Sequence, residues 1–490
     1  MQSLNAEGPS LRVMAEKEDE ALVAGRQSQS LSLFQQRNSN TSVVSMQSWS
    51  AHSAGLDQAR LRDPDLCVAE LNKRYAVVNC GNQVMIADDF NATHPFLTEK
   101  AFHGLYANAM VTVGGREQSV SRLWFSHPDR RQYTEGTVFD PGGSSPAEYY
   151  NLWKGFAVKA DPRGSCQLFL DHVRDVICNG DADCHEYVLS WLALMIQRPE
   201  RLPGVALCLL SGQGTGKGEF VKYLGKIIGR YLKHLTNRGQ IFGQFTEHLD
   251  DALLVFADEM HWGGSKDETG LLKGLITEES RSSERKYGAV MAVSNCIHLI
   301  IASNEEWAIP AEIDDRRFFV LEVSDHRVGD FAYFERLAAE RDNGGPEALL
   351  AYLQTRDINA FNTRDFPRTR ARLLQQLESL KPIDRWVFEL ASSAQFPLSV
   401  VGDGDPWPLK VPKEELYQAY MACRNETRAK GSVESKRALT QALARFGFAA
   451  TKGQHPAGGR RVQAYEVPSI EGLRSNIDRL LGYPTDWEPL

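Results

Sequence analysis

The stretch "LLSGQGTGKGEFVKYL", residues 209–224, decides the fold, because it joins an apolar run to an amphipathic helix through a glycine-rich turn. Such a turn at a helix N-terminus directs several backbone N–H groups at one point, which is typical of a phosphate-binding loop. Lys217 adds a positive charge suited to the outer phosphates of a nucleotide. The residues expected to contact the nucleotide are Gly212, Gln213, Gly214, Thr215, Gly216, Lys217, Gly218 and Glu219.

The loop departs from the common G-x₄-G-K-[ST] pattern at two positions. Ser211 stands where the first glycine is usual, and Gly218 stands where a hydroxyl normally meets Mg²⁺. The turn alone therefore leaves three interpretations open: a working site, a degraded site and a chance cluster of glycines. Without that hydroxyl, Mg²⁺ is expected on Asp258 and water, with Ser211 and Thr215 as weaker candidates.

Paired carboxylates end the next apolar run, "ALLVFADE", residues 252–259. Carboxylates leaving a buried strand are costly unless they serve a cation. In a phosphate site Asp258 would hold Mg²⁺ and Glu259 would orient the attacking water. The alternative is an acidic pair that simply faces solvent.

Two further apolar runs carry polar residues at their ends. Asn304 closes "CIHLIIASNE", residues 296–305, in a position to bond the terminal phosphate or the attacking water. Arg316 and Arg317 lie at the start of "RFFVLEV", residues 317–323, where a guanidinium group could reach a phosphate in a neighbouring subunit. Continuous apolar runs separated by helices predict a parallel, α/β sheet of the kind found in nucleoside triphosphatases.

From about Glu186 to Val323 the chain resembles the superfamily 3-like helicase domain of phage, plasmid and mobile-element primase-helicases, a branch of the AAA+ P-loop ATPases. The motifs that carry the resemblance are "YVLSWLALMIQRP", "SGQGTGKGEF", "VFADEM", "LLKGLITEES", "ERKYGAVMAVSNCIHLIIASNEEW" and "DDRRFFVLEV". In that branch G-K-G in place of G-K-[ST] is familiar, so the resemblance argues against a dead site. The expected catalytic residues are Lys217, Asp258, Glu259, Asn304, Arg316 and Arg317.

The resemblance implies a ring, usually a homo-hexamer, with ATP between subunits and single-stranded DNA in the central pore. It also implies a DNA-contacting hairpin within "SERKYGAVMAVSN", with Lys286 and Tyr287 near its tip. A lysine can grip phosphate and an aromatic ring can stack on a base. A solvated turn is the alternative for the hairpin. Lys273 could sense nucleotide or be an ordinary solvated lysine.

Composition and pattern divide the chain into six regions. We expect a disordered tail over 1–60, an α+β N-terminal region over 61–165, a helical collar over 166–202, the ATPase over 203–345, a helical connector over 346–404 and a winged-helix-like module over 405–490. The first 160 residues hold no convincing primase-polymerase catalytic set. A separate primase or polymerase could therefore be a partner.

The last region combines two helices with a glycine-rich basic hairpin. Its expected DNA-binding residues are Lys436, Arg437, Arg460 and Arg461. Winged helices also serve as protein-docking modules, so DNA contact and docking are both retained here.

Composition bounds the class of protein. The formal net charge of -8 means that nucleic-acid contacts must come from local basic patches. No apolar run is long enough to span a membrane and no signal sequence is evident, so a cytoplasmic protein of a bacterial or phage-infected cell is expected. Cys178, Cys184 and His185 could supply three zinc ligands, but no second pair lies at a suitable spacing.

We therefore expect an ATP- and Mg²⁺-dependent DNA helicase or translocase that replicates a phage, plasmid or mobile element. It would act on single-stranded or forked DNA. The alternatives are a nucleic-acid-stimulated ATPase of a defence system, and a loader or adaptor that does not unwind DNA.

Overall fold

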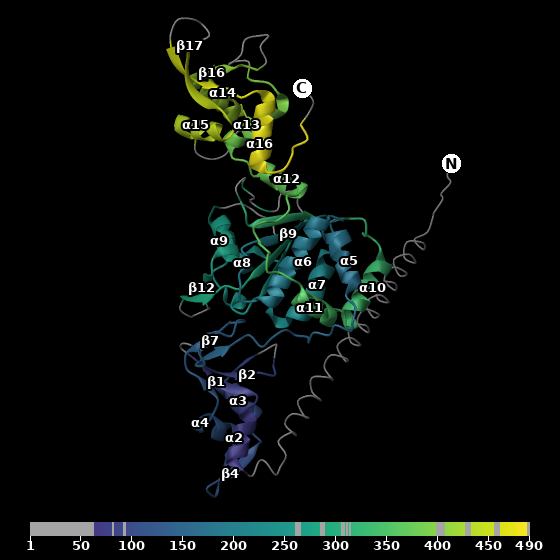
Figure 1. Ribbon diagram of the computed structural model, residues 1–490. Helices are drawn as coiled ribbons and strands as arrows, with labels where there is room; N and C mark the ends of the chain where they lie inside the picture. The colour runs from purple at the N-terminus through teal and green to yellow at the C-terminus, as the bar shows by residue number, and fades with distance from the viewer. Residues whose placement is uncertain are drawn as a thin grey trace, which may run out of the picture. The chain divides into compact units, whose positions relative to one another are not determined.

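The computed structural model describes residues 63–80, 83–91, 95–259, 266–284, 290–304, 309, 312, 315–397, 407–426, 433–454 and 461–487. The chain divides into two compact units, Met1–Gly136 and Thr137–Leu490 (Figure 1). The tail expected over 1–60 lies outside the described residues.

A small mixed sheet organises the first unit. Its strand order is β3-β2-β1-β6, in which β1 pairs antiparallel with β2 and parallel with β6. The side chain of Asp63 caps the first helix, whose first residue is Pro64. Trp124 is fully buried in the core and its indole N–H donates to Asn72 Oδ1 at 2.8 Å. The elements are α2 (Pro64–Asn72), β1 (Tyr75–Asn79), β2 (Val84–Asp88), β3 (Phe96–Thr98), α3 (Glu99–Leu105), β4 (Met110–Val113), β5 (Arg116–Ser119), α4 (Val120–Ser126) and β6 (Gln132–Tyr133).

A parallel sheet of five strands forms the centre of the second unit. Its order is β10-β11-β14-β9-β15, and every neighbouring pair is parallel. The strands are β9 (Ala206–Leu210), β10 (Leu232–Leu235), β11 (Leu254–Asp258), β14 (His298–Ser303) and β15 (Phe318–Glu322). The parallel sheet predicted from the apolar runs is confirmed. The sequence pattern missed the edge strand β10, "LKHL", because it pairs on one side only and its two central residues are polar.

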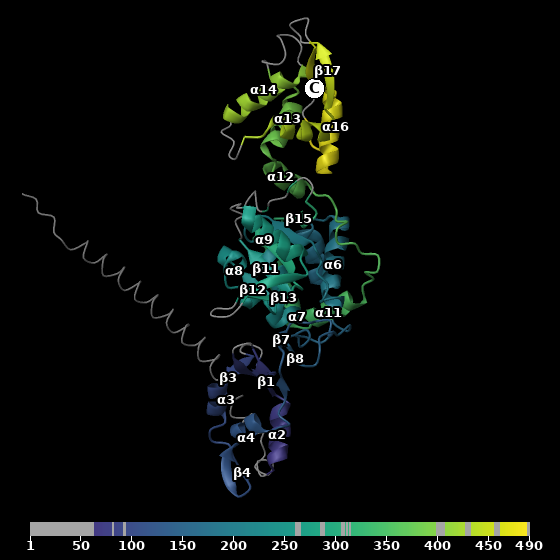
Figure 2. The same cartoon turned by 90° about the vertical axis from the view of Figure 1, so that its left-hand side faces the viewer.

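Helices surround this sheet (Figure 2). Helix α7 follows the glycine-rich turn and packs against α5, α10 and α11. The remaining elements of this region are β7 (Gly136–Val138), β8 (Tyr149–Asn151), α5 (Gln167–His172), a π-helical turn (Val173–Ile177), α6 (Ala182–Gln197), α7 (Lys217–Ile228), α8 (Arg238–Phe242), α9 (Lys266–Thr277), β12 (Ser280–Glu284), β13 (Val290–Ser294), α10 (Phe331–Asp342) and α11 (Gly345–Thr355). In the described part of the chain, no helix is long and apolar enough to cross a membrane.

The C-terminal module of the second unit has its own core, around Trp386, Tyr420 and Leu443. Helix α12 connects the two cores, because Ala371 belongs to the core of the parallel sheet and Leu373 to that of the module. The module's sheet has the order β16-β18-β17. Its elements are α12 (Arg370–Glu378), α13 (Pro382–Ser393), β16 (Lys410–Pro412), α14 (Lys413–Glu426), α15 (Lys436–Arg445), β17 (Ala449–Gln454), β18 (Arg461–Glu466) and α16 (Ile470–Leu481).

Candidate functional site

A cavity of about 350 Å³ lies at the carboxyl edge of the parallel sheet, and we call it the loop cavity. The glycine-rich turn follows β9, which lies between β14 and β15 in the sheet. After α7 the chain continues to β10, at the far edge of the sheet. In open α/β sheets, ligands bind beyond the carboxyl ends of the strands, at the place where the strand order changes direction. The lining residues are Gln213, Gly214, Thr215, Gly216, Lys217, Gly218, Glu219, Lys222, Asp258, Glu259, Asn304 and Phe334.

The glycines of the turn differ in what their positions require. Gly216 has φ +105°, and a Cβ there would come within 2.6 Å of His172 Cε1. Gly214 also has a positive φ, of +76°. At Gly218, in the first turn of α7, a Cβ would meet nothing within 4 Å. Gly216 is therefore fixed by packing and backbone, while Gly218 leaves room for a side chain.

Lys217 is buried and its ammonium group is held by four oxygen atoms of the site. It donates to Ser211 O at 2.9 Å, Ser211 Oγ at 2.7 Å, Gly212 O at 3.0 Å and Asn304 Oδ1 at 3.0 Å. Burial lowers the pKa of Lys217, against the opposing effect of Asp258 and Glu259. The lysine thus lies across the loop, beside both carboxylates, where phosphate oxygens could replace its present acceptors.

The carboxylates and the amide at the ends of β11 and β14 are coupled to one another. Asn304 Nδ2 donates to Glu259 Oε1 at 3.3 Å, so one amide contacts both Lys217 and Glu259. Glu259 has φ +53°, a left-handed conformation that is strained for a residue with a side chain. Asp258 Oδ2 lies 3.1 Å from Nε2 of His234 on the edge strand.

The oxygen atoms at this site suit a hard cation such as Mg²⁺, whose coordination would be completed by further oxygen ligands. Asp258 lines the cavity with a partly exposed carboxylate. Thr215 is buried and its hydroxyl lies 2.8 Å from Ser211 Oγ, which leaves both hydroxyls engaged with each other. Among the described residues no group of three or more His, Cys, Asp or Glu side chains could hold a metal by itself. Mg²⁺ here would need phosphate oxygens and water as its further ligands, as is usual for this ion.

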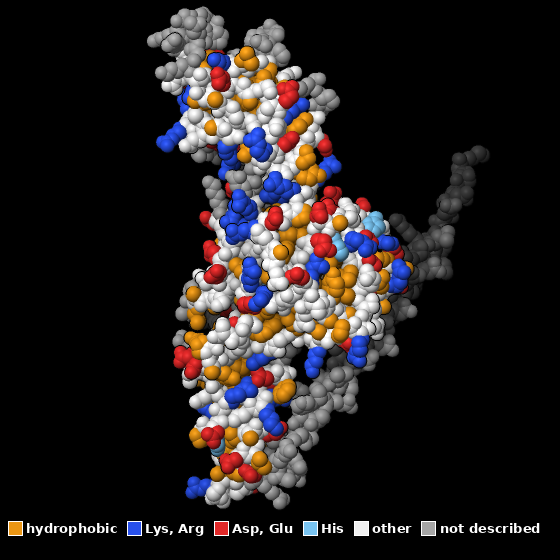
Figure 3. Space-filling view, viewed as in Figure 1, with side chains coloured by type: hydrophobic (Ala, Val, Ile, Leu, Met, Phe, Trp, Pro, Cys, Tyr) orange, Lys and Arg blue, Asp and Glu red, His pale blue; other side chains and the backbone are white. Residues whose placement is uncertain are grey.

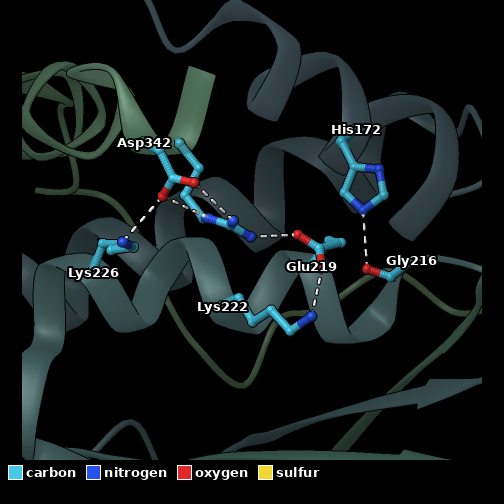
Figure 4. A network of polar contacts seen from close by, with 7 residues as sticks. His172, Gly216, Glu219, Lys222, Lys226 and Asp342 are labelled. Carbon is cyan, nitrogen blue, oxygen red and sulfur yellow. Dashed lines mark hydrogen bonds and ion pairs between the residues drawn. The ribbon is translucent and has the colours of Figure 1, made fainter. Parts of the chain in front are cut away.

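A buried histidine contacts the backbone of the glycine-rich turn (Figure 4). His172 Nε2 lies 3.2 Å from Gly216 O, and Nδ1 lies 2.9 Å from the Tyr333 hydroxyl. Burial lowers the pKa of His172 to about 4, so the ring is neutral at pH 7. Because a carbonyl can only accept, Nε2 carries the proton and Nδ1 accepts from Tyr333.

An ion-pair network joins α7, the helix after the glycine-rich turn, to α10 (Figure 4). Glu219 accepts from Arg341 Nη1 at 2.6 Å and from Lys222 Nζ at 2.7 Å. Asp342 pairs with both Arg341 and Lys226. The carboxylate of Glu219, which lines the loop cavity, is therefore already neutralised by two cations.

The two expected trans-acting arginines do not line the loop cavity. Arg317 pairs with Asp315 through its backbone N–H at 2.8 Å and through Nη1 at 3.6 Å. Arg316 is exposed and lines a different cavity. Lys273 lies 3.3 Å from Asp315 Oδ2 and 3.5 Å from Glu312 Oε1.

The expected DNA-binding residues are only partly described. Lys286, Tyr287 and Arg460 lie outside the described residues, as does the side chain of Arg461. The strands that flank residues 285–289, β12 and β13, form an antiparallel pair. In the C-terminal module Lys436 pairs with Glu414, and Arg437 is exposed.

The cysteines considered as zinc ligands lie in an apolar setting. Cys178 and Cys184 are buried, and burial raises the pKa of both thiols, to about 12 for Cys184. Since zinc binds thiolates, this environment favours neither residue as a ligand. His185 is half-buried and burial lowers its pKa.

Sequence reasoning missed Lys222 in α7 and four site residues from other elements: His172, His234, Phe334 and Arg341. His234 lies on the unpredicted strand β10, so no signal pointed to it. The other three come from α5 and α10, far from the loop in sequence, and reach it only through helix packing.

Comparisons with known proteins give two kinds of likeness. Residues 209–317 match the model of a family of unknown function (DUF5906). A segment of 181 residues is 32% identical to the DNA primase-polymerase of Nitratiruptor phage NrS-1. The match covers 36% of this chain and 25% of the relative, so it spans a quarter of the relative's length.

The fold is similar to solved structures of the NrS-1 C-terminal region. One apo structure has a TM-score of 0.62 at 18% sequence identity, covering 83% of this chain and 99% of the solved one. A second, the A form of the apo region, has a TM-score of 0.60 and covers 83% and 100%. The chain is thus homologous to part of a phage primase-polymerase and shares the fold of its C-terminal region.

Proposed function

We propose that this chain is an ATP-dependent DNA helicase or translocase of superfamily 3 type, with an AAA+ P-loop core, that acts in phage or mobile-element replication. The observation that carries the proposal is the loop cavity, where Lys217, Asp258, Glu259 and Asn304 come together from three separate stretches. The homology to a phage primase-polymerase supports the replication role.

The residues of the cavity have complementary roles in ATP hydrolysis. The N–H groups of the turn and Lys217 bind the β- and γ-phosphates. Glu259 orients the water that attacks the terminal phosphorus while the bond to the bridging oxygen breaks, which releases ADP and phosphate. Asp258 would hold Mg²⁺ together with phosphate oxygens and water, and the ion would neutralise part of the phosphate charge.

Asn304 links these two functions. Its side chain bonds both Lys217 and Glu259. Phosphate entering the cavity competes for Lys217, which frees the amide to bond the terminal phosphate or the water. Arg316 or Arg317 of a neighbouring copy would complete the site in a ring, usually hexameric, around single-stranded DNA.

The test is ATP hydrolysis by the full chain, with and without single-stranded DNA. Lys217→Ala and Glu259→Gln should each abolish the DNA-stimulated rate, whereas Lys226→Ala, on the same helix, should leave it within about twofold. Full activity in either site variant contradicts the proposal. Strand displacement on a forked duplex then separates a helicase from a loader or defence ATPase, which would hydrolyse ATP without unwinding.

A further inference from the structure

A second cavity, of about 490 Å³, is lined by arginines from three parts of the second unit. We call it the arginine cavity. Its guanidinium groups come from Arg316, Arg364, Arg368, Arg372 and Arg479, and the carboxylate in its lining is that of Asp365. Figure 3 shows Lys and Arg side chains gathered on this face around α12.

Within the described residues, these arginines lack the carboxylate partners that several other arginines of the unit have. Arg341, Arg356 and Arg445, for example, each pair with a carboxylate. Within the described residues, none of the five guanidinium groups of the arginine cavity forms an ion pair. Burial and the neighbouring charge of Arg368 lower the pKa of Arg372, with Asp315 opposing them. Like charges gathered without counter-charges are unfavourable unless an anion joins them.

The cavity walls are held in place by packing on both sides. Thr369 Oγ1 donates to Val320 O at 2.6 Å, and Arg372 Nη2 donates to Asp315 O at 2.6 Å, which fixes α12 against β15. On the other side, Arg368 lies against Gly482 at the end of α16, where an added Cβ would meet the guanidinium group. Hydrogen bonds and packing therefore hold Arg372 and Arg368 beside elements of both cores.

We propose that the arginine cavity binds the phosphodiester backbone of single-stranded nucleic acid, at a site separate from the hairpin and the C-terminal wing. Guanidinium groups suit phosphate oxygens because their N–H groups form a planar fork. A triphosphate held by another copy is a compact anion that calls for a single further guanidinium group, whereas a phosphodiester strand brings new charge with each nucleotide and suits a cluster of five. The choice of nucleic acid rests on the replication role proposed above.

The test measures binding of a labelled single-stranded oligonucleotide to the full chain without ATP, over a range of salt concentrations. Arg364→Ala with Arg368→Ala should weaken binding about tenfold or more and reduce the salt slope by roughly 1.4, if each arginine neutralises one phosphate. The control, Lys159→Ala with Arg336→Ala, removes the same charge from exposed positions elsewhere in the unit and should change neither quantity. Equal affinity and slope in the two double variants overturns the proposal.

Four further measurements keep the outcome decisive. Arg364→Ala alone, at an exposed side chain, should reduce the slope by roughly 0.7 even if the double variant folds poorly. Arg364→Lys with Arg368→Lys should retain most of the slope. Tripolyphosphate that displaces the oligonucleotide far more effectively than an unlabelled oligonucleotide of equal phosphate content would assign the cavity to a nucleotide and contradict the proposal. Because ATP is absent, Lys217→Ala should bind the oligonucleotide normally, so failure of the ATPase proposal is distinguishable.

Discussion

The loop cavity and the arginine cavity are built on opposite principles, although both are proposed to bind phosphate. In the loop cavity every charged side chain already has a partner: Lys217 has Asn304, Asp258 has His234, and Glu219 has Arg341. In the arginine cavity five guanidinium groups face one carboxylate.

This difference indicates two kinds of binding. A site whose charges are paired can exchange partners when its ligand arrives and leaves, which suits turnover of a nucleotide. A site with unpaired cations gains most of its binding energy from counterion release, which suits a polyanion and makes affinity strongly dependent on salt. The following experiments test whether the loop cavity is as firmly organised by its surroundings as this comparison requires.

The largest effect is expected at Gly216. Gly216→Ala places a Cβ in a backbone region that L residues rarely adopt and within 2.6 Å of His172, so the free energy of unfolding should fall by roughly 2–4 kcal/mol. Gly218→Ala, two residues away in the same helix turn, should instead raise it by about 0.5–1 kcal/mol, because alanine favours helix. Chemical denaturation of both variants measures these changes in the free energy of unfolding. Equal changes in the two variants would show that packing does not fix the turn.

The second expected effect is a pH dependence of the free energy of unfolding, caused by His172. The lowered pKa of His172, about 4 against an ordinary 6.5, means that the unfolded chain binds a proton more readily than the folded one between these values. Its contribution to stability is therefore present above pH 6.5 and is lost as pH falls toward 4. Between pH 7.5 and pH 5 the wild type should lose roughly 2 kcal/mol more stability than His172→Gln. Parallel losses in the two proteins would contradict a neutral, buried His172.

A smaller effect is expected from the missing hydroxyl. Gly218→Ser adds a hydroxyl in open space at the position where such loops usually present one to Mg²⁺. The Mg²⁺ concentration that half-saturates ATP hydrolysis should fall several-fold, or about 1 kcal/mol. Gly218→Ala is the control. An unchanged Mg²⁺ dependence in the serine variant would indicate that the cation is held away from α7.

The smallest effect is expected from the Glu219–Arg341 ion pair. Both side chains are largely but not fully buried, 21% and 16% exposed, so the coupling energy should be about 1 kcal/mol or less. A double-mutant cycle of Glu219→Gln and Arg341→Met, read by chemical denaturation, measures it. A coupling of several kcal/mol would make this pair a principal link between α7 and α10.

The sequence predicted the parts of the fold that follow from local pattern. Continuous apolar runs identified β9, β11, β14 and β15, because strands buried on both faces leave few polar residues. The same reasoning missed β10 at the sheet edge, because its two central residues, Lys233 and His234, are polar and leave only a short apolar signal.

The candidate site was predictable only where its residues lie at strand ends. Lys217, Asp258, Glu259 and Asn304 converge because the carboxyl ends of parallel strands meet at one edge. His172, Phe334 and Arg341 come from helices whose packing on α7 leaves no spacing signal. Arg372 lies near Arg316 because α12 packs on β15, and Arg364 and Arg368 come from the segment just before α12; no sequence motif predicts this contact.

The most direct test of the central claim separates nucleotide binding from hydrolysis at Glu259. A fluorescent ATP analogue and Mg²⁺ should bind Glu259→Gln within about threefold of the wild-type affinity, since the lysine and the turn are intact, while DNA-stimulated release of phosphate falls at least about a hundredfold. Wild-type phosphate release by Glu259→Gln would contradict the assignment of the loop cavity as the site of ATP hydrolysis.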